Sequence, residues 1–208
     1  MDEGARSRLR EARLAAGFSV RELSRRVGIS PSMLSQIENG RSEPSVATLY
    51  GLVSALSISV DNVLGTPVPA NGSRAQACRP PIVRAEDRAT LVMDGGVRWE
   101  RLTADADPHV EALLVTYPAG SSSSGSGLMR HSGHEYGYLI EGELVVQIGF
   151  ETFTLRPGDA LSFESATPHL YRNDTAMPAK GIWHVVGDDP AMRQERNVWT
   201  GDSPNSSR

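Results

Sequence analysis

The sequence predicts an α + β protein of two domains, in which a bundle of five short helices is followed by an antiparallel β barrel or sandwich. Apolar residues recur at intervals of three and four between residues 5 and 65, and Gly or Ser marks the breaks. Beyond residue 82, short alternating or β-branched runs are separated by Gly, Pro, Asp and Asn. A length of 208 residues is comfortable for two such domains.

Cap residues delimit the helices of the first domain, which is expected to span residues 5–65. Ser19, Ser30 and Ser45 each stand where a hydroxyl would cap the next helix, and Pro31 suits a first helical position. Gly17 suits the end of the first helix because glycine adopts positive φ freely. The helices are expected over roughly residues 7–16, 20–27, 31–39, 46–56 and 60–64.

The rest of the chain divides into a linker, a β domain and a tail. Residues 66–81 are rich in Pro, Gly, Ala and polar residues and lack any helical or strand period, so they are predicted to form a linker. The second domain is expected over residues 82–190, and 191–208 is expected to be a disordered C-terminal tail. A low-complexity tract at 119–127, AGSSSSGSG, is expected to be a mobile loop. Strands are expected at 97–102, 111–117, 143–148, 152–155 and 181–186.

Charge and composition restrict the class of protein. The net charge is −4, divided as +1 over residues 1–65 and −5 over the remainder, so any contact with DNA must depend on individual arginines. The first residues carry charges where a signal peptide needs an apolar core, and no apolar run approaches the roughly 20 residues of a membrane span. The single cysteine has no partner within the chain. A cytoplasmic protein with no membrane partner is predicted.

One segment has the pattern of a helix-turn-helix unit. It covers residues 20–40 and reads VRELSRRVGISPSMLSQIENG, which places two short helices around a glycine turn. Over residues 8–64 the chain resembles the Cro/C1-type (XRE) family of bacterial and phage regulators, through its apolar positions, its Ile-Glu-Asn-Gly end and the following Pro44-Ser45 helix start. The resemblance implies a homodimer that binds a double-stranded DNA operator, and a structural salt bridge between Arg13 and Glu38.

Polar residues outside the predicted core form a candidate DNA-binding surface. Gln36 is the expected base reader, because a Gln amide can pair bidentately with the N6/N7 edge of adenine. Arg41 first, and then Arg21 and Arg25, are expected to meet phosphates, although each would also serve as a solvated surface charge. The complete candidate set is Arg21, Arg25, Ser30, Ser32, Met33, Gln36, Asn39 and Arg41.

Two motifs in the second domain are similar to the pair that marks the cupin family, whose fold is a double-stranded β-helix barrel. They are RHSGHEYGYLIEGEL at residues 130–144 and PGDALSFESATPHLYRN at 157–173. The resemblance implies a metal site of His131, Glu135 and His169. Metal-binding cupins carry a further His where this chain has Met129.

The nature of the cupin site is left between two alternatives. Two His and one carboxylate suit a divalent metal with open coordination positions, such as Fe(II), and Mn, Ni or Zn would also fit. Alternatively, the same three side chains hydrogen-bond within a metal-free pocket for a small-molecule effector.

Two functions follow from these motifs. The first, which we favour, is a transcriptional regulator without enzymatic activity, whose cupin domain senses a small-molecule effector. The alternative is a non-haem iron enzyme resembling the phosphonate epoxidases, whose motif is matched by His131, Gly133, Glu135 and His169. Those enzymes use a Lys from the helical domain, whereas Lys180, the only Lys in this chain, lies in the second domain.

Overall fold

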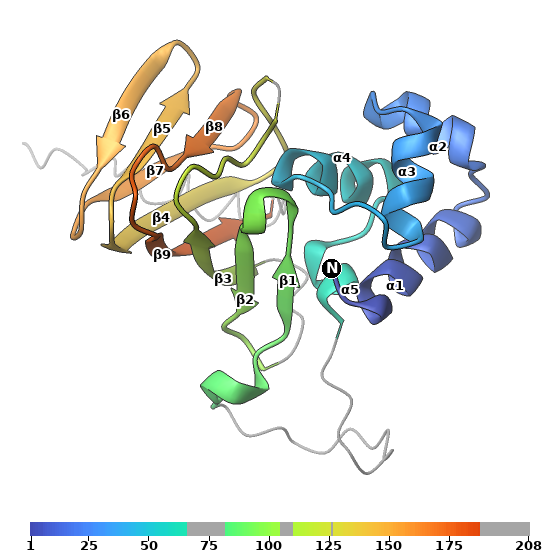
Figure 1. Cartoon of the computed structure of the whole chain (residues 1–208), viewed down its shortest axis with the longest axis horizontal. Coiled ribbons are helices and arrows are strands. Elements are labelled where there is room, and N and C mark those ends of the chain that lie inside the picture. Colours follow the sequence, from blue (N-terminus) through green and yellow to red (C-terminus); the bar gives the residue numbers. More distant parts are fainter. Residues whose placement is uncertain (66–81, 105–109, 126, 188–208) are drawn as a thin grey trace, which may run out of the picture.

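A computed structural model describes residues 1–65, 82–104, 110–125 and 127–187 (Figure 1). It confirms the predicted architecture of a five-helix domain followed by an antiparallel β domain. The predicted linker and the predicted tail lie outside the described residues, and the domain limits at 66–81 and 190 therefore remain predictions. None of the described helices is long and apolar enough to cross a membrane.

Serine and aspartate caps fix the helix boundaries of the first domain. Ser19, Ser30 and Ser45 accept hydrogen bonds from the backbone N–H three residues on, at 3.0–3.1 Å, as predicted. The first helix begins earlier than expected, because Asp2 accepts a hydrogen bond from the Ala5 N–H at 2.6 Å and acts as its cap. The helices are α1 (Glu3–Ala15), α2 (Val20–Val27), α3 (Pro31–Glu38), α4 (Val46–Leu56) and α5 (Val60–Leu64).

The β domain consists of two antiparallel sheets, as the family resemblance implied (Figure 1). One sheet has six strands in the order β1-β2-β3-β9-β4-β7, and the other has three in the order β6-β5-β8. Their inward side chains form the core, which is the arrangement of a flattened barrel. The strands are β1 (Thr90–Val92), β2 (Arg98–Arg101), β3 (Val110–Tyr117), β4 (His134–Glu141), β5 (Leu144–Ile148), β6 (Glu151–Leu155), β7 (Ala160–Glu164), β8 (His169–Arg172) and β9 (Ala179–Val186).

The serine-rich tract is not the mobile loop that its composition predicted. Ser123 is fully buried, its N–H donates to the Tyr171 carbonyl at 2.9 Å, and its hydroxyl accepts from the Tyr171 N–H at 3.0 Å. Ser121 accepts a hydrogen bond from the Asn173 N–H at 2.9 Å. The described part of the tract therefore adds to the β8 edge of the smaller sheet. The low complexity of the tract was misleading, because serine side chains are small enough to be buried in the barrel wall and can hydrogen-bond to the backbone of the neighbouring strand.

The two domains pack directly against each other. The Ala47 N–H at the start of α4 donates to the Ser123 carbonyl at 3.0 Å. Arg101 of β2 faces Asp61 of α5 at 3.6 Å, and both side chains are 2% exposed. Figure 1 shows α4 and α5 on the side of the helical domain that faces the sheets. A single cluster of buried apolar residues runs through both domains, so they share a core.

Candidate functional site

The helix-turn-helix unit is formed by α2, a tight turn and α3. Gly28 ends α2 in the left-handed conformation (φ 77°), which a side chain would strain. Leu23 of α2 and Leu34 and Ile37 of α3 are fully buried, so these residues fix the angle between the helices. The opposite face of α3 is left to solvent, as a recognition helix requires.

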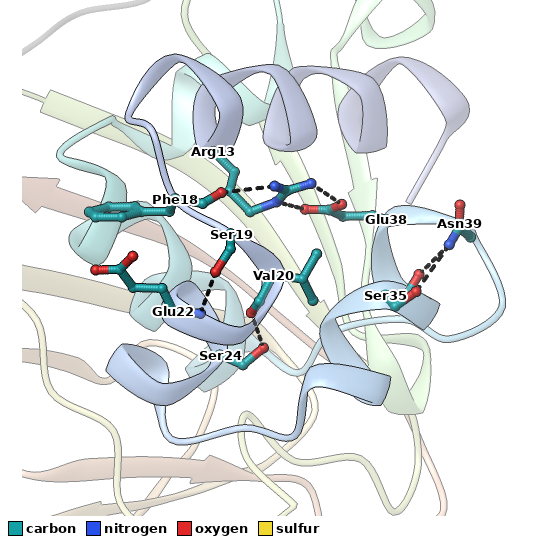
Figure 2. Close-up of polar contacts among 9 residues, drawn as sticks. All are labelled: Arg13, Phe18, Ser19, Val20, Glu22, Ser24, Ser35, Glu38 and Asn39. Carbon is teal, nitrogen blue, oxygen red and sulfur yellow. Dashed lines mark hydrogen bonds and ion pairs between the residues drawn. The ribbon is translucent and has the colours of Figure 1, made fainter.

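A buried ion pair ties α3 to α1, as the family resemblance implied. The Arg13 guanidinium donates to both carboxylate oxygens of Glu38, at 2.6 and 2.8 Å, and to the Phe18 carbonyl at 2.9 Å (Figure 2). The two side chains are 7% and 5% exposed. The hydrogen bond and charge of Glu38 raise the pKa of Arg13 despite its burial. This pair holds the recognition helix in place and leaves no group free to contact DNA.

The predicted DNA-contacting residues that are most available to a ligand are Gln36 and three arginines. Gln36 is exposed on α3. Arg21, Arg25 and Arg41 are exposed too, and no hydrogen bond or ion pair engages their guanidinium groups within the described residues. Ser32 is also exposed on the same helix. Free cationic groups flanking an exposed helix face match what phosphate contact demands.

Three other predicted DNA-contacting residues already have structural roles. The Asn39 amide donates to the Ser35 carbonyl at 2.8 Å, where it caps the end of α3 (Figure 2). The Ser30 hydroxyl caps the start of that helix, and Met33 is partly buried against the core. Their place in a DNA-binding surface therefore stays a prediction, with less of each side chain available than the sequence indicated.

The second candidate site brings together His131, Glu135 and His169, the three residues predicted as metal ligands. Their side chains are 5%, 3% and 0% exposed. Glu135 Oε1 lies 2.8 Å from His131 Nε2 and 3.0 Å from His169 Nε2, and all three atoms lie within 4.8 Å of one another. Gly133 makes this convergence possible: its φ is +105°, and a Cβ there would lie 2.6 Å from the Val186 carbonyl.

Both imidazoles are oriented through their second ring nitrogen. His169 Nδ1 lies 2.7 Å from the Thr167 carbonyl, and His131 Nδ1 lies 3.1 Å from the Ser132 carbonyl. A carbonyl can only accept, so each Nδ1 carries the proton, and in the neutral imidazole Nε2 is left as a bare lone pair. Metal-ligating histidines are commonly oriented in this way.

Glu135 is held as an anion with one oxygen directed at the histidines. Burial alone would raise its pKa, but His131 and His169, when their imidazoles are protonated at Nε2, outweigh this and lower the pKa to about 2. The second oxygen accepts a short hydrogen bond from the Tyr171 hydroxyl, which in turn accepts from the Trp183 indole N–H at 3.1 Å. Tyr171 and Trp183 were not predicted, because only the fold brings them to the carboxylate.

These atoms fit a divalent metal ion. His131 Nε2, Glu135 Oε1 and His169 Nε2 are buried, and none forms a well-directed hydrogen bond within the described residues. Adjacent ligand atoms at about 2.1 Å from an ion lie about 3.0 Å apart in octahedral geometry and about 3.4 Å apart in tetrahedral geometry. The separations of 2.8 and 3.0 Å are close to the octahedral value and shorter than the tetrahedral value. These three buried atoms are costly to leave uncompensated, and either a cation between them or protons on the two Nε2 atoms would compensate them. His134, by contrast, lies on the outer face of β4 and contacts Ser162 and Glu164.

Comparisons with known proteins match both domains. The family model described as "Helix-turn-helix" (HTH_3) matches residues 9–63, and that described as "Cupin domain" (Cupin_2) matches 113–185. The HTH-type transcriptional regulator PuuR of Escherichia coli (strain K12) is 26% identical over 189 residues, which cover 89% of this chain and 95% of PuuR. The chain belongs to the helix-turn-helix transcriptional regulators that carry a cupin domain.

Solved structures extend the comparison to the fold of this regulator. An HTH_3-family transcriptional regulator from Vibrio cholerae has a TM-score of 0.62 at 22% identity, covering 90% of this chain and 97% of that chain. The hydroxypropylphosphonic acid epoxidase from S. wedmorenis has a TM-score of 0.43 at 21% identity, covering 88% of this chain and 96% of the enzyme. The second likeness is too distant to bear on the activity of the regulator.

The regulator also has a site residue that no motif predicted, because the helical domain supplies it. Tyr50 of α4 stacks on His131, with ring centroids 3.9 Å apart and ring planes 7° apart. Val46 and Tyr50 complete the wall of a narrow chamber that also contains Glu135, Met129 and Tyr171. Met129 thus lies beside the site where metal-binding cupins have a further His.

A cleft of about 270 Å³ lies between α4 and the barrel, and Tyr50 lines both this cleft and the chamber. His131 and Glu111 of β3 both line it. Glu111 accepts hydrogen bonds from the Val60 N–H at 3.2 Å and from the Tyr50 hydroxyl at 3.4 Å. Burial outweighs these bonds and raises the pKa of Glu111 to about 7. The candidate metal centre therefore lies at the boundary between the two domains.

Proposed function

We propose that this regulator binds a double-stranded DNA operator as a homodimer, with α3 of each protomer in the major groove. Gln36 contacts a base, and Arg21, Arg25 and Arg41 contact phosphates. The exposed face of α3 supports these roles, as do three guanidinium groups that have no hydrogen bond or ion pair to any described residue. A homodimer matches the two half-sites that helix-turn-helix proteins usually recognise.

The cupin domain acts as the sensor, with His131, Glu135 and His169 as its centre. The observation that carries this role is the convergence of three buried side-chain atoms that can ligate a metal, at the domain boundary. A divalent ion of Fe, Mn, Ni or Zn held there would supply open coordination positions for a small effector with oxygen or nitrogen donors. Tyr171 orients Glu135, and the backbone carbonyls of Ser132 and Thr167 orient the two imidazoles.

The test combines operator selection with metal analysis of the full chain. Operator fragments are selected from genomic DNA, and the metal content of freshly purified protein is measured before and after treatment with a chelator. Alanine at His131, Glu135 or His169 is expected to abolish metal binding and any response of operator binding to metal, while the operator is still bound. If the protein binds no DNA fragment sequence-specifically in any condition, the regulator role is excluded.

A second candidate function, metal-dependent catalysis, is favoured only by the chemistry of the same three donors. Two His and one carboxylate with open positions occur in non-haem iron oxygenases. The candidate DNA-binding surface has no use in such an enzyme. Stoichiometric iron, together with turnover of a small substrate and no operator binding, would establish catalysis in place of regulation.

A further inference from the structure

One side of the candidate metal centre is covered by residues of the DNA-binding domain. Tyr50 is 7% exposed, and its ring lies parallel to that of His131 at a centroid distance of 3.9 Å. Trp99 of β2 packs against Tyr50 from the barrel side, at 5.5 Å. Tyr50 and Val46 are the residues of the helical domain that line the chamber containing Glu135. One ring face of a candidate metal ligand is thus covered by a recognition-domain side chain.

A metal bound at the centre would affect the stack of Tyr50 on His131. A bond from Nε2 to a metal lies in the plane of the imidazole, so metal binding fixes both the plane and the position of His131. His131 Nε2 lies 2.8 Å from Glu135 Oε1. A metal bonded to both atoms would set their separation, and tetrahedral binding at about 3.4 Å would shift the imidazole relative to Tyr50. The two rings are stacked at 3.9 Å, so the His131 imidazole cannot move far unless the Tyr50 ring moves with it.

Tyr50 is also held at its other end. Its hydroxyl contacts Glu111, and Glu111 accepts the first N–H of α5, from Val60. A movement of the Tyr50 ring would therefore affect α4, which carries Tyr50, and α5, which Glu111 contacts. Neither helix belongs to the barrel, and both belong to the domain that carries α2 and α3.

Gly51, the residue after Tyr50, connects α4 to the helix-turn-helix unit. Gly51 packs so closely on α2 that a Cβ at this position would lie 2.9 Å from Val27 Cγ1. Helix α2 carries Arg21 and Arg25, two of the proposed phosphate contacts, and packs on α3 through Leu23. Helix α4 therefore touches the candidate metal centre with Tyr50 and the helix-turn-helix unit with the next residue.

We propose that Tyr50 couples occupancy of the His131, Glu135 and His169 centre to DNA binding, through its stack on His131 and the position of α4. The proposal rests on the sensor role proposed above and names the residue that transmits the signal. Coupling between sites in regulators is commonly about 5- to 150-fold in affinity. Tyr50 is a positioning residue in this scheme, since it touches a ligand of the metal and not the metal.

The experiment measures operator affinity of the full chain with and without one equivalent of Zn²⁺, after removal of metal by a chelator. Tyr50→Leu removes the stack and keeps an apolar side chain. Tyr50→Phe keeps the stack and removes the hydroxyl. Tyr138→Leu is the matched control, because Tyr138 is exposed on the outer face of β4, away from the chamber.

We expect Zn²⁺ to change the operator affinity of the wild type, Tyr50→Phe and Tyr138→Leu by about fivefold or more. Tyr50→Leu should bind both Zn²⁺ and operator, with an affinity for operator that Zn²⁺ no longer changes. An equal response in Tyr50→Leu and wild type overturns the proposal. Wild type that binds Zn²⁺ without any change in operator affinity also overturns it, and leaves metal binding by the barrel intact. Failure of the wild type to bind Zn²⁺ at all overturns the metal-sensing role together with the coupling.

Hydrogen exchange on the wild type tests the same point without a substitution. The Ala47 N–H, bonded to Ser123 across the domain boundary, and the α4 amides at residues 46–56 should change their exchange rates when Zn²⁺ binds. The exposed strand β6 serves as an internal reference. Unchanged exchange in α4 under saturating Zn²⁺ contradicts a role for this helix, even if Tyr50→Leu does not fold.

Discussion

Gln36 is exposed on α3, and its amide is not engaged by any hydrogen bond within the described residues. Gln36→Ala should weaken operator binding by about 1–3 kcal/mol and leave nonspecific binding almost unchanged, because a base contact carries sequence information. Competition binding with operator and unrelated DNA measures both. Gln147→Ala in β5 is the control and should change neither. Equal losses on both DNAs would instead assign Gln36 to the phosphate backbone.

Arg41 lies just beyond α3 with its guanidinium exposed. Arg41→Ala should weaken specific and nonspecific binding alike, and lower the slope of log K against log salt by about one, since one phosphate contact releases about one counterion. A salt titration of the variant and of Arg156→Ala measures this. Arg156 is 77% exposed on the barrel and should leave the slope unchanged. An unchanged slope in Arg41→Ala removes Arg41 from the DNA-binding surface.

At the scale of elements, α3 depends on α1 through the ion pair of Arg13 and Glu38. Arg13→Ala should cost about 3–5 kcal/mol of unfolding free energy, because Glu38 would be left buried and unpaired. The loss of DNA binding would follow from the loss of folding. Arg10→Ala, an exposed arginine on the same helix, should change little. Thermal unfolding and operator binding of both variants separate these effects. A wild-type melting temperature with lost DNA binding would make Arg13 a DNA contact.

The helices and strands were largely predictable because their signals are local. A serine before an apolar helical pattern caps a helix wherever the helix later packs, so the predicted and observed bounds of α2, α4 and α5 coincide. Alternation likewise located β2, β3, β5, β6 and β9, whereas β1, β4, β7 and β8 were not among the predicted strands. The serine tract was misjudged because its partners, Tyr171 and Asn173, lie about fifty residues away in the sequence. No local pattern carries that information.

The candidate metal centre was predictable for the opposite reason: family motifs preserve the spacing of His131, Glu135 and His169 although the contacts are long-range. The second half of the site was not. Tyr50 lies in another domain, and its contact with His131 exists only because the two domains share a core. A motif describes one domain, so residues that a neighbouring domain contributes stay invisible until the domains are placed together.

At the scale of the whole molecule, the domain boundary contains a titratable group. Glu111 faces Tyr50, Asp61, His131 and the Val60 N–H, and burial raises its pKa to about 7. An unfolded Glu has a pKa of about 4.3. The folded protein therefore binds more protons between these two values, and its stability should fall as the pH rises from about 4.5 to 7.

Glu111→Gln should remove most of this pH dependence, because the amide keeps an acceptor for the Val60 N–H and carries no charge. Relative to wild type, the variant should gain about 2 kcal/mol of unfolding free energy between pH 5 and pH 8. Denaturant unfolding across this range, with chelator present so that His131 holds no metal, measures the difference. Glu151→Gln on the exposed strand β6 is the matched control and should follow the wild-type curve. Parallel stability curves for wild type and Glu111→Gln would show that the carboxylate is well solvated, and that the domain boundary is open to water at this point.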